Sequence, residues 1–353
     1  MGDAPHKTPV RHSLGLLLWL PALSLASCAS SSELVEGDRG PHRLVHVRDS
    51  LPRDIGAEGW TSDWIGGSWT FNQALPSWNV DLPEGAAFRV DIRTESSVGP
   101  GETPWMDIGG WGPWPEMERS PTECPGAKVA IDILRLEDVH DRVQLRLRTR
   151  ELGTGQHVTL RRLSVNLSQW WEPQTEWEIA GRVAPVEVSV PQRRQTEEAP
   201  HLAPRICSPT SVAMVLEYLG VDEPTARVAE LLYDAENDIY GNWNRATQGA
   251  SLLGVDGTLR RINHWEEAAS LLGEGLPLII SIVAKPGALI GAPYESTAGH
   301  LLVLCGLDGR GGAIVMDPAV PPGDMGTRTY SMRELEVCWL RRGGYTYVLG
   351  PRD

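Results

Sequence analysis

The chain has 353 residues, of which 41% are hydrophobic and 22% charged, and its net charge is −14 at pH 7. This length favours two domains. The composition is that of a globular protein, which excludes collagen, coiled coils and bulk disorder. The acidic balance argues against a nucleic-acid partner, because duplex binding needs a basic face. Fourteen tryptophans against two phenylalanines are the unusual feature.

The first residues have the pattern of an export signal. Basic residues precede an apolar run from Leu14 to Leu25, which has the length of a signal peptide and is too short for a membrane-spanning helix. The run ends in Leu-Ala-Ser-Cys, which resembles a bacterial lipobox. We therefore expect residues 1–27 to be a lipoprotein signal peptide, with Cys28 lipidated and anchored at the outer or plasma membrane. Secretion after cleavage behind Ala29 is the alternative.

A predicted tether of residues 28–41 leads into a β-rich domain of residues 42–181. Apolar and polar residues alternate there, and Gly/Pro-rich turns separate the runs. This pattern predicts an antiparallel β-sandwich, jelly-roll-like in type. The alternating runs are Phe88–Ile92, Val129–Ile133, Val143–Leu147 and Leu163–Leu167.

Ten of the fourteen tryptophans lie in this β-rich domain. A row such as Trp105, Trp111 and Trp114 could stack on the sugar rings of a cell-surface glycan. Tryptophans in a small sandwich more often fill the core, with the indole N–H satisfied locally. We therefore favour a structural role and keep the glycan partner as the alternative.

Residues 182–353 form a second predicted domain, in which the spacing of apolar residues changes from that of strands to that of helices. Helices come first, and a hairpin around residues 306–312 joins two of the strands that follow, which is an α+β order. The predicted helices are Thr210–Leu219, Thr225–Asp234 and Trp265–Leu272, and the predicted strands are Leu278–Val283, His300–Cys305, Ala313–Asp317 and Tyr345–Leu349.

Cys207, His300 and Asp317 form the candidate catalytic group. Cys207 stands where the first helix is expected to begin, and Pro209 suits a first helical turn. Free N–H groups and the helix dipole stabilise a thiolate there. His300 opens one strand and Asp317 closes the next, so a hairpin can bring them together as base and orienting residue. Alone, each is more often structural; together they favour catalysis.

Three motifs resemble a known family. Cys-Ser-Pro-Thr-Ser, Gly-His-Leu-Leu-Val-Leu and Met-Asp-Pro-Ala are similar to motifs of papain-fold cysteine peptidases of the bacteriocin-processing type, family C-39-like. The resemblance covers Val186 to Leu349, and Pro-Ser-Trp-Asn and Trp-Met-Asp-Ile-Gly are similar to the front domain of exported members. It implies a papain-like domain in which Cys207 is the nucleophile, His300 the base and Asp317 the orienting residue.

In that family a glutamine upstream of the cysteine helps to form the oxyanion hole. Here Gln195 is the candidate and Gln192 the reserve. The resemblance implies peptide-bond hydrolysis through a thioester and calls for no metal or cofactor. We expect Tyr240, Asn242 and Trp243 to line the substrate cleft.

Two other functions stay open at this point. The chain could be an inert cell-surface binding protein that uses its tryptophan-rich domain, or a thiol acyltransferase or amidase on the same fold. One disulfide among Cys124, Cys305 and Cys338 is also open, because sequence alone does not assign it.

Overall fold

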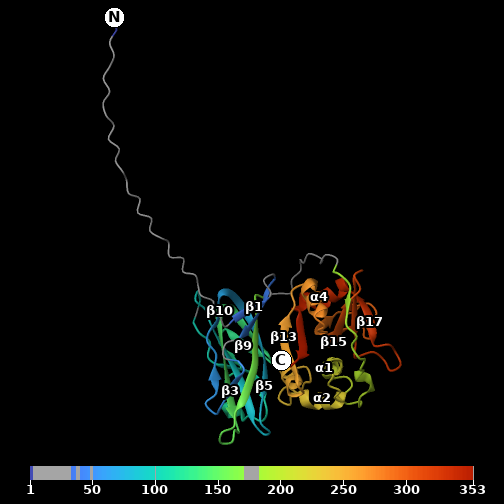
Figure 1. Cartoon of the computed structure of the whole chain (residues 1–353), viewed down its shortest axis with the longest axis horizontal. Helices are drawn as coiled ribbons and strands as arrows, with labels where there is room; N and C mark the ends of the chain where they lie inside the picture. Colours follow the sequence, from blue (N-terminus) through green and yellow to red (C-terminus); the bar gives the residue numbers. More distant parts are fainter. Residues whose placement is uncertain (3–32, 37–39, 48–50, 100, 171–182, 353) are drawn as a thin grey trace.

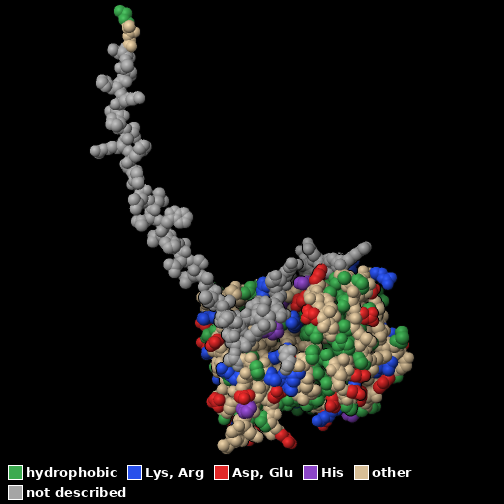
Figure 2. Space-filling view, in the orientation of Figure 1, with side chains coloured by type: hydrophobic (Ala, Val, Ile, Leu, Met, Phe, Trp, Pro, Cys, Tyr) green, Lys and Arg blue, Asp and Glu red, His purple; other side chains and the backbone are tan. Residues whose placement is uncertain are grey.

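The computed structural model describes residues 1–2, 33–36, 40–47, 51–99, 101–170 and 183–352. The expected signal peptide apart from its first two residues, the lipidation site Cys28 and the link at residues 171–182 lie outside the described residues. Two antiparallel sheets, one from each half of the chain, stand side by side (Figure 1). No helix within the described ranges has the length and apolarity needed to span a membrane. Acidic and basic side chains are interspersed on the face seen in Figure 2.

The first sheet is antiparallel throughout and is centred on two long strands, β5 and β10. Its main path runs β1-β2-β11-β5-β10-β6-β7, which leaves β7 at one edge. The strands are β1 (Glu33–Glu36), β2 (His42–Val47), β3 (Arg53–Ile55), β4 (Trp60–Thr61), β5 (Ile65–Asp81), β6 (Ala87–Glu95), β7 (Met106–Trp111), β8 (Glu123–Cys124), β9 (Ala127–Ala130), β10 (Ile133–Arg150) and β11 (Val158–Ser168), with a 3-10 turn at Glu116–Glu118.

One hydrophobic core fills this domain, and residues such as Phe71, Trp78 and Phe88 are fully buried in it. Strands β6, β10 and β11 contain three of the predicted alternating runs. The prediction of one continuous strand over Val129–Ile133 was wrong, because the chain turns between β9 and β10. Ile131 adopts a left-handed φ of 64° at this turn, a conformation that a β-branched residue rarely takes and that alternation of residue types does not reveal.

The tryptophans of the possible sugar platform lie against arginines. The guanidinium groups of Arg93 and Arg146 each lie 4.6 Å from the ring centroid of Trp105. Arginines lie over Trp111 and Trp114 in the same way, at 4.1 and 5.1 Å. Cation–π contacts of this kind stabilise a folded surface, so they favour a structural role for these rings.

The second sheet has the order β13-β18-β14-β15-β16-β17, with β12 beside β15. Helices α1, α2 and α4 correspond to the three predicted helices, but α3, α5, β12, β13 and β17 were not predicted, and α4 follows β13 rather than preceding every strand. The elements are β12 (Val186–Glu187), a 3-10 turn at Gln195–Glu197, α1 (Cys207–Tyr218), α2 (Thr225–Leu232), α3 (Trp243–Leu252), β13 (Val255–Arg261), α4 (Trp265–Gly273), β14 (Leu278–Ala284), β15 (Thr297–Leu307), β16 (Gly312–Met316), β17 (Thr327–Ser331), α5 (Met332–Cys338), a 3-10 turn at Leu340–Arg342 and β18 (Tyr345–Pro351).

The two domains meet along β13, the edge strand of the second sheet. The side-chain amide of Asn79 donates to the Gly257 carbonyl at 3.0 Å and accepts from the Gly257 N–H at 3.3 Å. Asn166 donates to the Leu259 carbonyl at 2.8 Å and accepts from the Arg261 N–H at 3.1 Å. Amide side chains of the first domain therefore satisfy backbone groups that an edge strand otherwise leaves unpaired.

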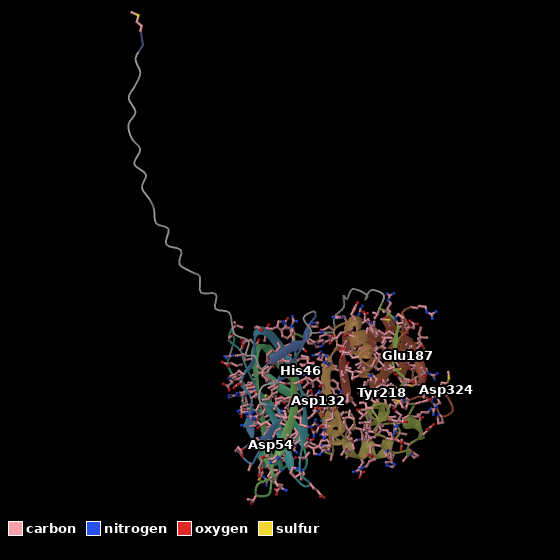
Figure 3. The ribbon with its side chains drawn as sticks, viewed as in Figure 1. His46, Asp54, Asp132, Glu187, Tyr218 and Asp324 are labelled. Carbon is pink, nitrogen blue, oxygen red and sulfur yellow. The ribbon has the colours of Figure 1, made fainter. Side chains whose placement is uncertain are left out.

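Helix α3 makes the second part of this contact. Gln248 exchanges two hydrogen bonds with the backbone of Val80, at 2.9 and 2.7 Å. Asp132 accepts the first N–H of α3, from Trp243, at 2.7 Å, and Figure 3 places Asp132 on the side of the first domain that faces the second. Leu75 of the first domain joins the hydrophobic core of the second. The domains are therefore packed as one unit.

Candidate active site

Cys207 is the first residue of α1, where the helix N–H groups have no intrahelical acceptor. Pro209 falls in the first turn, as predicted. The hydroxyl of Thr210 donates to the Ile206 carbonyl at 2.8 Å, and that of Ser211 donates to the Leu301 carbonyl at 3.2 Å. These bonds fix the start of the helix against β15, next to His300.

His300 and Asp317 come together across the predicted hairpin. In the ladder between β15 and β16, Val303 pairs with Met316, so Asp317 continues the strand toward His300. The His300 Nε2 and the Asp317 Oδ1 lie 2.9 Å apart, and the two side chains are 7% and 0% exposed. The Nε2–H therefore points to the carboxylate, which leaves Nδ1 for the thiol.

The carboxylate of Asp317 accepts hydrogen bonds from four directions. Besides His300, the phenols of Tyr294 and Tyr330 donate to Oδ2 at 3.0 and 2.9 Å, and the Ala319 N–H donates to Oδ1 at 2.9 Å. Burial raises the pKa of Asp317, but the hydrogen bond and charge of His300 and these donors outweigh burial and lower it. Asp317 is therefore held as an anion in a fixed orientation.

Cys207 and His300 shift each other's pKa. Burial raises the pKa of the Cys207 thiol, but the hydrogen bond and positive charge of His300 outweigh burial and lower it. Burial lowers the pKa of His300, whereas hydrogen bonds with Asp317 and Cys207 raise it to about 10. Both directions favour a thiolate–imidazolium pair at neutral pH, the reactive form of a cysteine nucleophile.

The other three described cysteines have the opposite character. Cys124, Cys305 and Cys338 are free thiols, so the structure shows no disulfide among them. Burial raises the pKa of each, and that of Cys305 reaches about 12. Among the four described cysteines, Cys207 is therefore the one whose pKa is lowered.

The glutamine candidates lie on different sides of the segment that precedes α1. Gln195 is buried, its backbone N–H donates to the Pro318 carbonyl at 2.9 Å, and its side-chain NH₂ donates to the Ala203 carbonyl at 2.8 Å. The structure thus places Gln195 beside the turn that carries Asp317. The reserve, Gln192, is exposed and donates to the Asp324 carbonyl.

The expected cleft residues have distinct surroundings. Asn242 caps α3 through the Arg245 N–H at 3.0 Å, and the ring of Trp243 stacks on Tyr345 with centroids 4.1 Å apart. Both therefore support α3. Tyr240 lies under the guanidinium of Arg205, two residues before Cys207, at 5.2 Å.

Tyr294 and Tyr330 are the site residues that sequence reasoning missed. Neither lies in a motif, and only the packing of the 285–296 loop and β17 around Asp317 brings their hydroxyl groups to it. The described residues hold no cluster of three or more His, Cys, Asp or Glu side chains suited to a metal ion.

Comparison with known proteins matches both domains. Residues 187–347 match the Peptidase C39-like family, and residues 53–168 match the Peptidase C39 N-terminal domain. No curated protein matches the chain.

Solved structures that are similar to part of the chain include a C39-like peptidase from Bacillus anthracis, with 19% sequence identity, 48% of this chain and 100% of that chain covered, and a TM-score of 0.38. Another is a double glycine motif protease from an AMS/PCAT transporter in complex with the leader peptide, with 22% sequence identity, 48% of this chain and 99% of that chain covered, and a TM-score of 0.33. A third is the peptidase domain of Streptococcus ComA, a bi-functional ABC transporter, with 19% sequence identity, 42% of this chain and 93% of that chain covered, and a TM-score of 0.31.

Proposed function

Since residues 187–347 belong to the Peptidase C39-like family of cysteine peptidases, we propose that the chain hydrolyses peptide bonds with Cys207, His300 and Asp317 as its catalytic triad. The observation that carries this proposal is the buried His300–Asp317 pair at 2.9 Å, next to Cys207, with the pKa of the thiol lowered and that of the imidazole raised. Each group has the charge that its role requires.

The reaction follows from these positions. The Cys207 thiolate attacks the scissile carbonyl carbon, and the imidazolium of His300 gives its proton to the leaving amine as the C–N bond breaks. Water then attacks the thioester and gives a proton to His300, and the acid leaves as Cys207 returns to its thiolate. The Cys207 N–H and the second N–H of the Gln195 amide are the proposed donors to the oxyanion.

Mass spectrometry of a mixed peptide library tests this function. Wild type should cut peptides, Cys207→Ser should not, and Cys124→Ser should cut as wild type does, because the Cys124 thiol lies outside the triad. Equal cleavage by wild type and Cys207→Ser would contradict the proposal. Products joined to an added amine in place of water would identify an acyltransferase.

We further propose that the protein is exported and anchored through lipid on Cys28. The apolar run and the lipobox-like tetrapeptide before Cys28 support this. In fractionated cells, wild type should sediment with membranes and incorporate labelled fatty acid, whereas Cys28→Ala should do neither. Membrane association that survives this substitution would refute the anchor.

For the finer fold class, we propose a β-sandwich followed by a papain-like domain. The single core inside the first sheet supports the sandwich. The packing of α1 on an antiparallel sheet and the chain order Cys207, His300, Asp317 support the papain-like arrangement. A crystal structure at ordinary resolution tests both assignments.

A further inference from the structure

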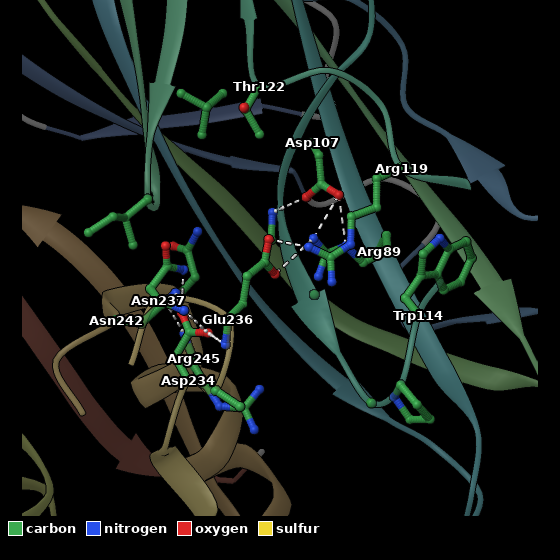
Figure 4. Close-up of a pocket in the computed structure, with 18 of the residues that line it drawn as sticks. Arg89, Asp107, Trp114, Arg119, Thr122, Asp234, Glu236, Asn237, Asn242 and Arg245 are labelled. Atoms are coloured by element: carbon green, nitrogen blue, oxygen red, sulfur yellow. Dashed lines mark hydrogen bonds and ion pairs between the residues drawn. The ribbon is translucent and has the colours of Figure 1, made fainter. Parts of the chain in front are cut away.

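A polar cavity of about 420 Å³ lies where the two domains meet. We call it the domain-seam cavity. One wall comes from β6, β7 and the loop after β7, and the other from residues 233–245 of the peptidase domain (Figure 4). The residues that matter here are Arg89, Trp114 and Arg119 from the first domain and Glu236, Asn244 and Arg245 from the second.

Several polar atoms in the two walls of the cavity lack a hydrogen-bond partner among the described residues. Asn244 is only 2% exposed; its amide nitrogen donates to the Ile108 carbonyl at 3.2 Å, but its Oδ1 accepts from no group. The Nε atoms of Arg119 and Arg245 and the indole N–H of Trp114 are also buried and unpaired. Buried polar groups are nearly always paired, so the cavity suits a ligand with acceptor oxygens and one N–H donor.

Glu236 already shows how a carboxylate sits in the cavity. Its carboxylate reaches across the seam and pairs with Arg119, and it lies 3.6 Å from Arg89 (Figure 4). The Glu236 side chain is 45% exposed, whereas Asp107, the closer partner of Arg89 at 2.7 Å, is 3% exposed. Exposed ion pairs contribute little, so an incoming carboxylate can replace Glu236 on Arg119 while Asp107 stays in place.

The cavity shares a loop with the active site. Residues 233–242 carry Tyr233 and Glu236 on the cavity side. On the other side, the Arg205 guanidinium pairs with Asp238 at 2.7 Å and lies over Tyr240, just before the chain reaches Cys207. The loop at residues 233–242 therefore contacts both the cavity and the segment that leads to Cys207.

We propose that the domain-seam cavity binds an acidic side chain of the peptide substrate, at a distance from the scissile bond. Arg119 binds the carboxylate in place of Glu236, and the Asn244 Oδ1 accepts a backbone N–H of the same peptide. The proposal rests on the proposed function, in that the substrate is taken to be a peptide. It gives the N-terminal domain a direct part in substrate selection.

Affinity selection tests this with the Cys207→Ala full chain, which keeps peptides intact. The probes are two N-acetylated, C-amidated nonapeptide libraries, one carrying Glu and the other Gln at a scanned position. We expect at least tenfold enrichment of Glu peptides, lost in Arg119→Gln and kept in the matched variant Arg53→Gln, whose arginine lies on β3 away from the cavity. Equal retention of the Glu and Gln libraries would overturn the proposal.

A second variant separates binding from misfolding. Glu236→Gln removes the competing carboxylate and should retain Glu peptides several-fold better; any other result would overturn the displacement argument. Because retention needs no turnover, Glu selectivity without cleavage by wild type would sink the peptidase function alone. Cleavage without Glu selectivity would sink the cavity proposal alone.

Discussion

Asp317→Asn isolates the charge that orients His300. Asparagine keeps the size of the side chain and an oxygen acceptor but removes the negative charge from a contact of 2.9 Å between two buried groups. A hydrogen bond to a charged group contributes about 1.5–3 kcal/mol, and one pKa unit corresponds to about 1.4 kcal/mol. The pKa of His300, raised to about 10 in the wild type, should therefore fall by about 1–2 units.

An NMR titration of the His300 imidazole measures this shift directly, with the resonance assigned by its loss in His300→Ala. Asp324→Asn is the matched control, because Asp324 lies on the exposed loop after β16 and pairs with Arg328; it should leave the titration unchanged. A pKa in Asp317→Asn that equals the wild-type value would refute the view that the Asp317 charge holds the imidazolium.

Three further predictions concern stability in urea. The raised pKa of His300 stabilises the folded state, and this stabilisation is fully present below the unfolded pKa of about 6.5 and is lost as the pH rises through about 10. The difference in urea midpoint between wild type and His300→Ala should therefore become smaller from pH 6 to pH 10.5. A difference that stays constant would count against the pKa shift. Asn166→Ala leaves two buried backbone groups of β13 unpaired and should lower the free energy of unfolding by about 2–4 kcal/mol, whereas Thr159→Ala on the same strand, exposed in its contact with Asp54, should change it by less than about 0.5 kcal/mol. Equal effects would argue against the seam. Trp105→Leu removes two cation–π contacts and should cost about 1–2 kcal/mol; no loss of stability would show that the arginines do not stabilise the ring.

The contact between His300 and Asp317 could be predicted because its geometry is local. His300 and Asp317 lie at the ends of two strands joined by a short hairpin, and antiparallel pairing alone brings such positions together. Pro209 and the apolar face after it mark the start of α1, which places Cys207 at the helix end. Gln195 lies 12 residues before Cys207 in a segment without periodic pattern, so its position depended on tertiary packing.

The contact between the two domains could not be predicted, because it also depends on tertiary packing between distant segments. The buried residues of α3 include Asn244, Thr247, Gln248 and Gly249, so the helix shows no apolar stripe and was missed. Its contacts are single polar pairs with distant residues, such as Asp132 with the first N–H of the helix. Because each contact uses a single carboxylate or amide side chain, the contacts produce no repeating pattern of residue types in the sequence.

The amide side chains of Asn79 and Asn166 each present one C=O and one N–H to β13, the same pair that a residue of a further strand would present. These two amides thus take the place of an eighth strand, although no described strand of the first domain pairs with the second sheet. A peptidase domain expressed by itself would expose this edge, and a second copy could pair with it strand to strand. The N-terminal domain therefore covers the edge at which the second sheet would otherwise be open to such pairing.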